Sequence, residues 1–282
     1  MRIEKWQALG NDYLILEAAE LPCALTAGRV RRLCDPHFGV GADGVLLLHR
    51  SEDPAHVASL RIFNPDGSEA ELSGNGAREA IMYVRRHGWT DQDEFSLLTA
   101  AGPVRPTITG PSTCRVDMGA ASTTSPAYPS GAADGHGTLL SDGTTYAFQH
   151  VSIGNPQCAI AVEDPEALDL PRIGPGIERH ELFPQRTNVS FWKAIDAHTI
   201  RARIFERGVG ETLSSGTGAG GAAVAHVLAG GASPVTVRLD GGELLVDVDA
   251  SLNVTLTGWA VPVFAGTLSP ELIEELHATD AE

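Results

Sequence analysis

The chain has 282 residues and carries 36 acidic against 20 basic side chains, a formal net charge of −16 at pH 7. This balance argues against nucleic acid or an anionic membrane surface as the main partner. Hydrophobic residues make up 43% of the chain, enough for sizeable cores, and the length indicates two domains. The sequence has neither an apolar run long enough to span a membrane nor the apolar segment of a signal peptide, so we expect a cytoplasmic protein.

The sequence offers little to hold a metal or a cofactor. Lys5 and Lys193 are the only lysines and lie in strand-like segments, which disfavours a pyridoxal phosphate Schiff base. Residues 39–44 match a dinucleotide-binding glycine pattern but precede a strand-like run, and residues 216–221 match it too far from the preceding strand. The four cysteines, which we expect to be reduced and structural, have no metal-ligand spacing: Cys23, Cys34, Cys114 and Cys158. We therefore expect no cofactor and no metal.

Most of the elements that the sequence predicts are short strands. The expected strands are 13–17, 45–48, 60–63, 151–153, 159–162, 187–192, 200–205, 235–239, 244–248 and 254–256. A helix is expected over 77–87, with an apolar stripe and Gly88 as its stop, and another over 219–228, apolar nearly all round and so buried. The Gly-, Ser-, Thr- and Pro-rich segment 109–145 is the expected hinge, and the acidic end 271–282 is an expected solvated helix or tail.

The chain contains an internal repeat. Residues 61–80 align without a gap to residues 203–222, at an offset of 142, with nine of twenty positions identical. Leu9-Gly10-Asn11 returns as Ile153-Gly154-Asn155 at an offset of 144. Chance similarity of glycine-rich loops would have to produce two matches in the same order at nearly the same offset. We therefore interpret the chain as two halves derived from one ancestral unit.

Each repeat contains Ser-Gly-x-Gly-Ala where a glycine-rich turn leads into a helix. The helix N-terminus leaves backbone N–H groups unpaired beside Ser73 or Ser215, which makes an anion-binding mouth. In the simpler interpretation the two serines are only N-caps, worth about 1 kcal/mol each. As a symmetric pair, they are expected to face one another across a cleft between the halves and to hold one small ligand. Such a site suits inversion of a stereocentre, because one group removes a proton and the other delivers one.

Seven blocks in order give the sequence a strong resemblance to the diaminopimelate epimerase family, over essentially its whole length. The blocks are Gly10-Asn11-Asp12, residues 35–44, residues 64–78, Gly154-Asn155-Pro156, Thr187-Asn188-Val189, residues 206–212 and Gly216-Thr217-Gly218. The resemblance implies a cofactor-independent amino-acid epimerase or racemase of lysine and peptidoglycan biosynthesis, acting as a homodimer.

The same resemblance implies an α/β (α+β) fold of two pseudo-symmetric domains, each a β-barrel-like sheet around a central helix. We place one half at residues 1–118 with 264–282 and the other at residues 119–263.

The resemblance also assigns site residues. Four asparagines match the family's contacts to the distal amino and carboxyl groups of the substrate: Asn11, Asn64, Asn155 and Asn188. Glu206 and Arg207 match its charged contacts, and Gly74-Asn75 and Gly216-Thr217 match the loops that hold the reacting α-carboxylate. Amides suit a zwitterionic diacid because they supply donors and acceptors without adding net charge.

The sequence departs from the family at the reacting groups. Where the family places one cysteine as base and another as acid, this chain has Ser73 and Ser215. A serine hydroxyl is a weaker acid than a thiol by roughly five pKa units, so its alkoxide costs on the order of 7 kcal/mol more. The family's Asn-Pro-His is Asn155-Pro156-Gln157 here, and an amide cannot exchange a proton near pH 7.

Four interpretations stay open at this point. The chain is an epimerase or racemase whose serines act through water or are activated by a carboxylate such as Glu206, Glu69 or Glu211; Ser73, Ser215 and Glu206 are then the catalytic candidates. It is an isomerase of a more acidic substrate with one carboxylate base. It binds a small ligand without turnover. Or the serines were engineered, against which Gln157 argues because such a design would not need it.

Overall fold

The computed structural model describes residues 1–71 and 73–279. The chain divides into two compact units, Met1–Val116 with Gly258–Glu282, and Asp117–Thr257. The sequence-based boundary at residue 263 differs from this division. The first unit takes up the chain again at Gly258, and residues Val261–Thr267 form a strand that pairs with the first strand of the chain. Over the described residues, no helix is long and apolar enough to cross a membrane.

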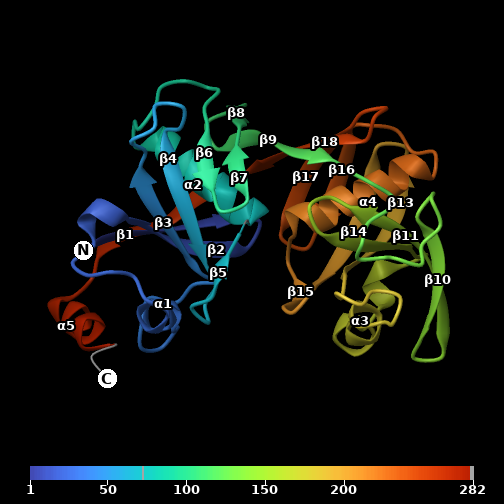
Figure 1. Cartoon of the computed structure of the whole chain (residues 1–282), viewed down its shortest axis with the longest axis horizontal. Helices are drawn as coiled ribbons and strands as arrows, with labels where there is room; N and C mark the ends of the chain where they lie inside the picture. Colours follow the sequence, from blue (N-terminus) through green and yellow to red (C-terminus); the bar gives the residue numbers. More distant parts are fainter. Residues whose placement is uncertain (72, 280–282) are drawn as a thin grey trace. The chain divides into compact units, whose positions relative to one another are not determined.

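The first unit is a mixed sheet with the strand order β19-β1-β2-β3-β4-β6-β7, and β5 pairs with β4 (Figure 1). Its elements are β1 (Arg2–Ala8), β2 (Asn11–Glu17), η1 (Ala18–Glu20), α1 (Ala27–Cys34), β3 (Val45–Arg50), β4 (Ala58–Phe63), β5 (Glu69–Ala70), α2 (Gly74–Arg86), β6 (Leu97–Thr99), β7 (Gly102–Val104), β8 (Pro106–Ile108), β19 (Val261–Thr267) and α5 (Pro270–Ala278).

The second unit has the strand order β10-β11-β12-β13-β14-β16-β17-β18, and β15 pairs with β14. Its elements are β10 (His136–Ser141), β11 (Thr144–Ser152), β12 (Pro156–Ala161), η2 (Pro165–Ala167), α3 (Leu170–Glu178), β13 (Asn188–Asp196), β14 (Thr199–Glu206), β15 (Gly210–Thr212), α4 (Gly216–Leu228), β16 (Val235–Leu239) and β17 (Gly242–Val248). The chain crosses between the units within two further strands, β9 (Thr113–Ala120) and β18 (Asn253–Trp259).

The strand registers reproduce the repeat seen in the sequence. Leu14 of β2 lies opposite Val45 of β3 in a parallel pair, and 144 residues later Cys158 of β12 lies opposite Val189 of β13, again in parallel. The next, antiparallel pairs join Val45 to Phe63 and Val189 to Phe205. Helices α2 and α4 begin and end 142 residues apart. The expected class of two related α+β domains is therefore confirmed, and the equivalence extends well beyond the aligned twenty residues.

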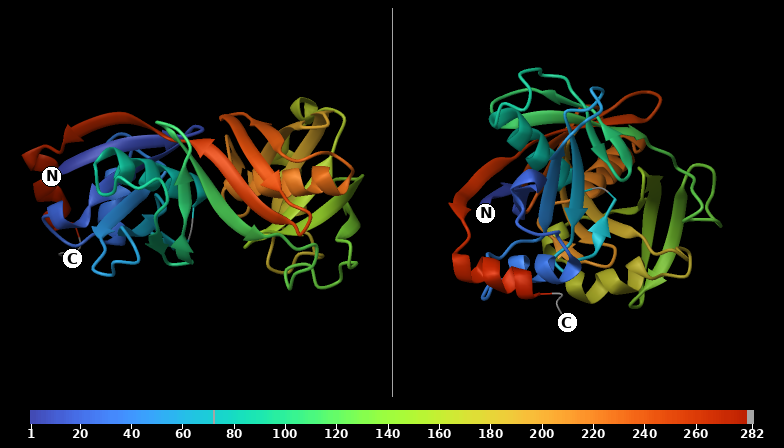
Figure 2. Two further views of the ribbon diagram at one scale, coloured as in Figure 1. Left: turned by 90° about the horizontal axis from the view of Figure 1, so that it is seen from above. Right: turned by 60° about the vertical axis from the view of Figure 1, so that its left-hand side comes forward.

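One helix lies at the centre of each unit, as the two views of Figure 2 show for α2 and α4. Helix α4 contacts strands β11, β12, β13, β14, β16 and β17, which explains why its sequence is apolar nearly all round. Helix α2 was expected to be amphipathic, yet every residue from Asn75 to Val84 is buried. Strands β1, β2, β3 and β4 contact α2, so its polar residues are enclosed within the unit.

Helices α1 and α3 were not predicted from the sequence. Helix α1 has only eight residues, and α3 contains Pro175 within its span, a residue that normally ends a helix. Their N-caps, Thr26 and Asp169, each accept a backbone N–H bond three residues on. The segment 109–145, expected as the hinge between the halves, contains the crossing from the first unit to the second between Val116 and Asp117. It also holds the strands β9 and β10.

Candidate active site

Ser73 caps the N-terminus of α2. Its Oγ accepts a hydrogen bond of 3.1 Å from the Gly76 N–H and a second of 3.2 Å from the Tyr13 hydroxyl on β2. The extended backbone of Ser73 (φ −129°, ψ 123°) is that of a normal N-cap. The serine therefore sits at the positive end of the helix dipole, where an anionic group is favoured.

An asparagine pair lies beside Ser73 in the first unit. Asn75 Nδ2 donates to Asn11 Oδ1 at 3.2 Å, and Asn11 Nδ2 donates to Asp43 Oδ2 at 2.9 Å. The buried Arg78 donates to Asn75 Oδ1 at 2.5 Å and to the Gly74 carbonyl at 3.1 Å. Four residues expected from the sequence, Asn11, Ser73, Gly74 and Asn75, thus come together at one helix end.

Ser215 caps α4 in the same way, because its Oγ accepts the Gly218 N–H at 3.2 Å. The Ser215 hydroxyl also donates to Glu206 Oε2 at 3.0 Å. Beside it, Asn155 Nδ2 donates to Thr217 Oγ1 at 3.2 Å, the counterpart of the Asn11–Asn75 pair. The second unit therefore gathers Asn155, Glu206, Ser215, Gly216 and Thr217, all expected from the sequence.

The other expected residues are placed as follows. Asn188 Nδ2 donates to the Pro156 carbonyl at 3.0 Å, and its Oδ1 accepts the Arg207 N–H at 2.9 Å. The Arg207 guanidinium bonds the Gln185 carbonyl at 3.1 Å. Asn64 occupies the position equivalent to Glu206, but its amide bonds Ser68 Oγ within its own turn at 3.0 Å. Only the second unit therefore offers a carboxylate from this position.

The two half-sites differ in their ionisable groups. Burial raises the pKa of the Glu206 carboxyl above its ordinary value, and the hydrogen bond from Ser215 opposes part of this rise. A carboxylate with a raised pKa is a stronger base once ionised. Ser215 thus has a proton acceptor beside it, whereas Ser73 has the Tyr13 hydroxyl.

The cysteines do not replace the missing thiols. All four are free, and burial raises the pKa of the Cys34 and Cys114 thiols to about 12. Burial raises the pKa of Cys158 as well. These buried thiols stay protonated at neutral pH and cannot supply a thiolate. Over residues 1–71 and 73–279, no group of three or more His, Cys, Asp or Glu side chains is placed to hold a metal ion.

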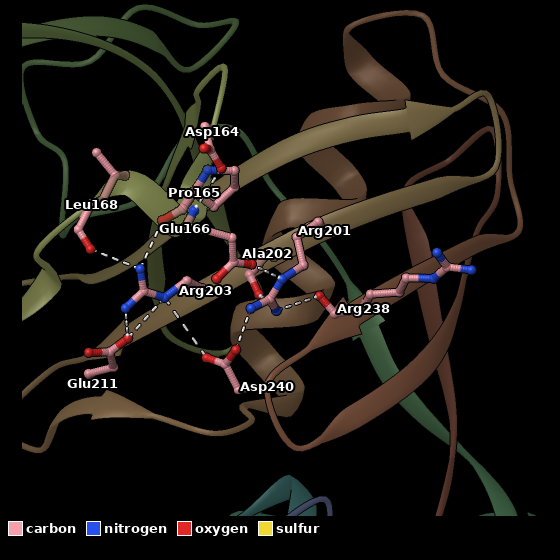
Figure 3. Close-up of polar contacts among 10 residues, drawn as sticks. All are labelled: Asp164, Pro165, Glu166, Leu168, Arg201, Ala202, Arg203, Glu211, Arg238 and Asp240. Atoms are coloured by element: carbon pink, nitrogen blue, oxygen red, sulfur yellow. Dashed lines mark hydrogen bonds and ion pairs between the residues drawn. The ribbon is translucent and has the colours of Figure 1, made fainter.

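The hairpin that leads to Ser215 is fixed by arginines (Figure 3). Arg203 donates to Glu211 at 2.5 Å and Arg201 pairs with Asp240, which joins β14 to β15 and to the turn after β16. In the first unit the equivalent pair is Arg61 with Glu69, joined by two bonds of 2.8 Å. Glu69 and Glu211 were possible activators of the serines, but both are held by guanidinium groups.

Gln157, which stands where the family has histidine, packs on α4. Its Nε2 donates to Asn155 Oδ1 at 2.6 Å, so it orients an expected binding residue. A Cβ added at Gly221 would lie 2.8 Å from Gln157 Cβ and Cγ, so the glycine makes room for this side chain.

A family model described as diaminopimelate epimerase matches residues 4–124 and 149–262. The chain belongs to the diaminopimelate epimerase family. Diaminopimelate epimerase 2 of Nostoc sp. is 38% identical over 277 residues, which are 96% of this chain and 97% of the relative. The diaminopimelate epimerase of Azoarcus sp. is 40% identical over 275 residues, 95% and 98% of the two chains.

Solved structures share the fold of this diaminopimelate epimerase family member. A hydroxyproline epimerase from Agrobacterium vitis has a TM-score of 0.68 at 16% identity and covers 97% of this chain and 94% of its own. A PhzF-family phenazine biosynthesis protein from Bacillus anthracis has a TM-score of 0.66 at 18% identity, with 95% and 99% covered. At these identities the likeness establishes the fold.

Tyr13, which bonds Ser73, was not among the site residues predicted from the sequence. The residue directly follows the Gly10-Asn11-Asp12 block, and at the 144-residue offset of the repeat its equivalent is Gln157. A comparison of the two halves one residue beyond the motif would have drawn attention to it. Arg78, which holds Asn75 from inside the unit, was overlooked because a buried arginine on a central helix is uncommon.

Proposed function

We propose that the chain inverts the α-carbon of diaminopimelate, or of a closely related amino acid, without a cofactor. Family membership over nearly the whole chain supports the reaction class, and the names of the relatives support the substrate. The two helix mouths, each with a serine at its N-cap, supply the two proton-transfer groups that inversion needs.

The observation that carries the proposal is the 3.0 Å hydrogen bond from Ser215 to Glu206. The α-hydrogen leaves as a proton to Ser215 Oγ while the serine's own proton moves to the Glu206 carboxylate. The electron pair of the broken C–H bond stays on the carbon. Because the proton passes on in the same step, no free alkoxide forms and its cost of about 7 kcal/mol relative to a thiolate is avoided. Ser73 then delivers its proton to the other side of the carbon.

Binding is assigned to the polar groups around each serine. The backbone N–H groups at Gly74-Asn75 and Gly216-Thr217 are suited to the reacting α-carboxylate, because helix N-termini favour anions. The amides of Asn11, Asn64, Asn155 and Asn188, with Glu206 and Arg207, are assigned to the distal amino and carboxyl groups.

A second candidate is an isomerase of a more acidic substrate, with Glu206 as a direct base. The raised pKa of the Glu206 carboxyl favours it, since that group would not need the serine for a more acidic C–H. Such an enzyme would keep activity after Ser215→Ala, whereas the epimerase would lose it.

Chiral chromatography of the L,L isomer incubated with the protein tests the proposal. We expect the meso isomer to appear, and Ser215→Ala to lower its rate by at least a hundredfold. Tight binding of diaminopimelate by calorimetry with no conversion would instead indicate a ligand-binding protein without turnover.

Two further proposals rest on family likeness alone: the chain works as a homodimer, and it works in the cytoplasm. Light scattering on the purified protein tests the first, and a single-chain mass would reject it.

A further inference from the structure

The hydrogen-bonding capacity of the two serines is used differently. A hydroxyl has one donor and two acceptor positions. Ser73 Oγ accepts from the Gly76 N–H and from the Tyr13 hydroxyl. These two bonds use its acceptor positions and leave its own proton to be donated. Ser215 Oγ accepts from the Gly218 N–H and donates to Glu206. These two bonds leave it one acceptor position, a lone pair that can receive a proton. One serine is set up to give a proton and the other to receive one.

The Tyr13 hydroxyl is held in place by the fold. The residue is 6% exposed, and its ring lies against Gly44. A Cβ added at Gly44 would be 2.6 Å from the ring Cε1 and 2.3 Å from the Phe63 carbonyl oxygen, so the ring's position needs a glycine there. The Leu14 N–H donates to the Gly44 carbonyl at 3.0 Å and fixes the two strands beside the ring.

This arrangement is confined to one half of the duplication. At the 144-residue offset, Gln157 and Asn188 occupy the positions of Tyr13 and Gly44. Gln157 and Asn188 lie opposite each other on the paired strands β12 and β13. The second unit therefore has two amides where the first has a phenol and the space for its ring. The phenol beside Ser73 is a difference between the halves that their shared ancestry does not explain.

We propose that Tyr13 is a positioning residue that makes Ser73 the proton donor of the reaction and returns a proton to it. This inference rests on the proposed epimerase function. As Ser73 gives its proton to the carbanion, the Tyr13 hydroxyl proton moves to Ser73 Oγ and the negative charge stays on the phenolate. The cycle closes when the phenolate takes a proton from water and Glu206 releases one.

A phenol suits this task because it is a stronger acid than an alcohol by several pKa units. Without the Tyr13 hydroxyl, Ser73 would be left as an alkoxide after delivery. The carbanion would then more often regain a proton from the Ser215 side, which restores the starting configuration.

The test compares two rates in heavy water for Tyr13→Phe. One is inversion, and the other is exchange of the α-hydrogen for deuterium with retention of configuration. We expect kcat to fall tenfold to a hundredfold, KM to change less than threefold, and the ratio of retention to inversion to rise at least tenfold. Tyr83→Phe is the matched control, because it removes another buried phenol from the same unit, one that bonds Glu17 at 2.7 Å. We expect it to keep the wild-type ratio.

Ser73→Ala removes the atom through which Tyr13 acts. We expect Ser73→Ala to raise the ratio of retention to inversion as Tyr13→Phe does, and the double variant to raise it no further. Ser73→Ala therefore tests the proposal even if Tyr13→Phe folds poorly. Tyr13 replaced by 3-fluorotyrosine keeps the hydroxyl and should keep the wild-type ratio. An unchanged ratio in folded Tyr13→Phe, or an additive effect in the double variant, would overturn the role of Tyr13. Absence of both inversion and exchange in the wild type would instead reject the proposed function.

Discussion

The Ser215 hydroxyl donates to Glu206 Oε2 across 3.0 Å, and its counterpart Ser73 accepts from the Tyr13 phenol across 3.2 Å. The position equivalent to Glu206 in the first unit is Asn64, whose amide bonds Ser68 instead. The duplication has therefore kept a serine at the mouth of each central helix but placed a carboxylate beside only one of them. The Ser215 hydroxyl therefore has a carboxylate beside it to take its proton, whereas the Ser73 hydroxyl has a phenol.

Glu206→Gln tests that difference. The amide keeps the size of the side chain but cannot take the proton from Ser215, so we expect kcat to fall by roughly 10²- to 10⁴-fold, the usual range for a lost general base. In the wild type, kcat/KM should fall on the acid side with an apparent pKa above the ordinary glutamate value, because burial raises the pKa of Glu206. Glu243→Gln, an exposed pair with Arg238, is the control and should leave the rate and its pH profile unchanged.

Restoring the thiols should increase activity. In the double variant Ser73→Cys with Ser215→Cys, each helix N-terminus lowers the pKa of its thiol, so a useful fraction is thiolate at neutral pH. We expect inversion to rise at least tenfold, measured by chiral chromatography. Ser269→Cys places a thiol at the N-cap of α5 and should change nothing. A double variant no faster than the wild type would mean that the serines are not the groups that exchange protons.

Adding a methyl group to α4 should destabilise the protein at Gly221 but not at Gly220. At Gly221 the new Cβ would lie 2.8 Å from Gln157 Cβ, which is anchored to a strand, so we expect Gly221→Ala to lower the unfolding free energy by about 1–3 kcal/mol. At Gly220 the nearest atom is the end of the Ile153 side chain at 3.0 Å, which can move. Gly220→Ala should therefore be neutral or stabilising by up to about 1 kcal/mol. Equal urea midpoints for the two variants would contradict this.

Glu79 should make stability depend on pH. Its side chain is fully buried in α2, and burial raises its pKa well above the ordinary value, so folding favours the neutral form. The stabilisation from the neutral Glu79 carboxyl is fully present below pH about 4.3, the pKa of this carboxyl in the unfolded chain. It is lost as the pH rises toward the higher pKa of the carboxyl in the folded protein. Gln cannot ionise, so Glu79→Gln should gain stability over the wild type by up to about 1.4 kcal/mol per pH unit above that point. Urea unfolding from pH 5 to 8 measures it, with the exposed Glu274→Gln as control.

Much of the fold could be predicted because its signals are local. Each of the ten expected strands overlaps a strand of the structure, and the repeat predicted two related halves. The starts of α2 and α4 were placed three residues late, because Gly74 and Gly216 are poor helix formers. Helix α3 was missed because Pro175 and its neighbouring glycines conceal it. The burial of α2 on every side is a property of the surrounding sheet and has no pattern in its own sequence.

The candidate site also has a part that the sequence predicted and a part that it could not. The helix-capping serines and the Asn11 and Asn155 pairs lie where the repeated motifs predicted contacts. The acid–base partners could not be predicted, because Glu206, Glu69 and Glu211 look alike in sequence. They differ in what they bond: Glu206 meets a serine, whereas Glu69 and Glu211 each meet an arginine.

The most direct test of the account is proton NMR of L,L-diaminopimelate incubated with the wild-type protein in heavy water. If Ser215 removes the α-proton and a solvent-exchanged Ser73 delivers another, each meso product formed should carry one deuteron at the inverted carbon, and Ser215→Ala should abolish its incorporation. Meso product that keeps its original α-proton, or an undiminished α-proton signal with no product, would contradict the account.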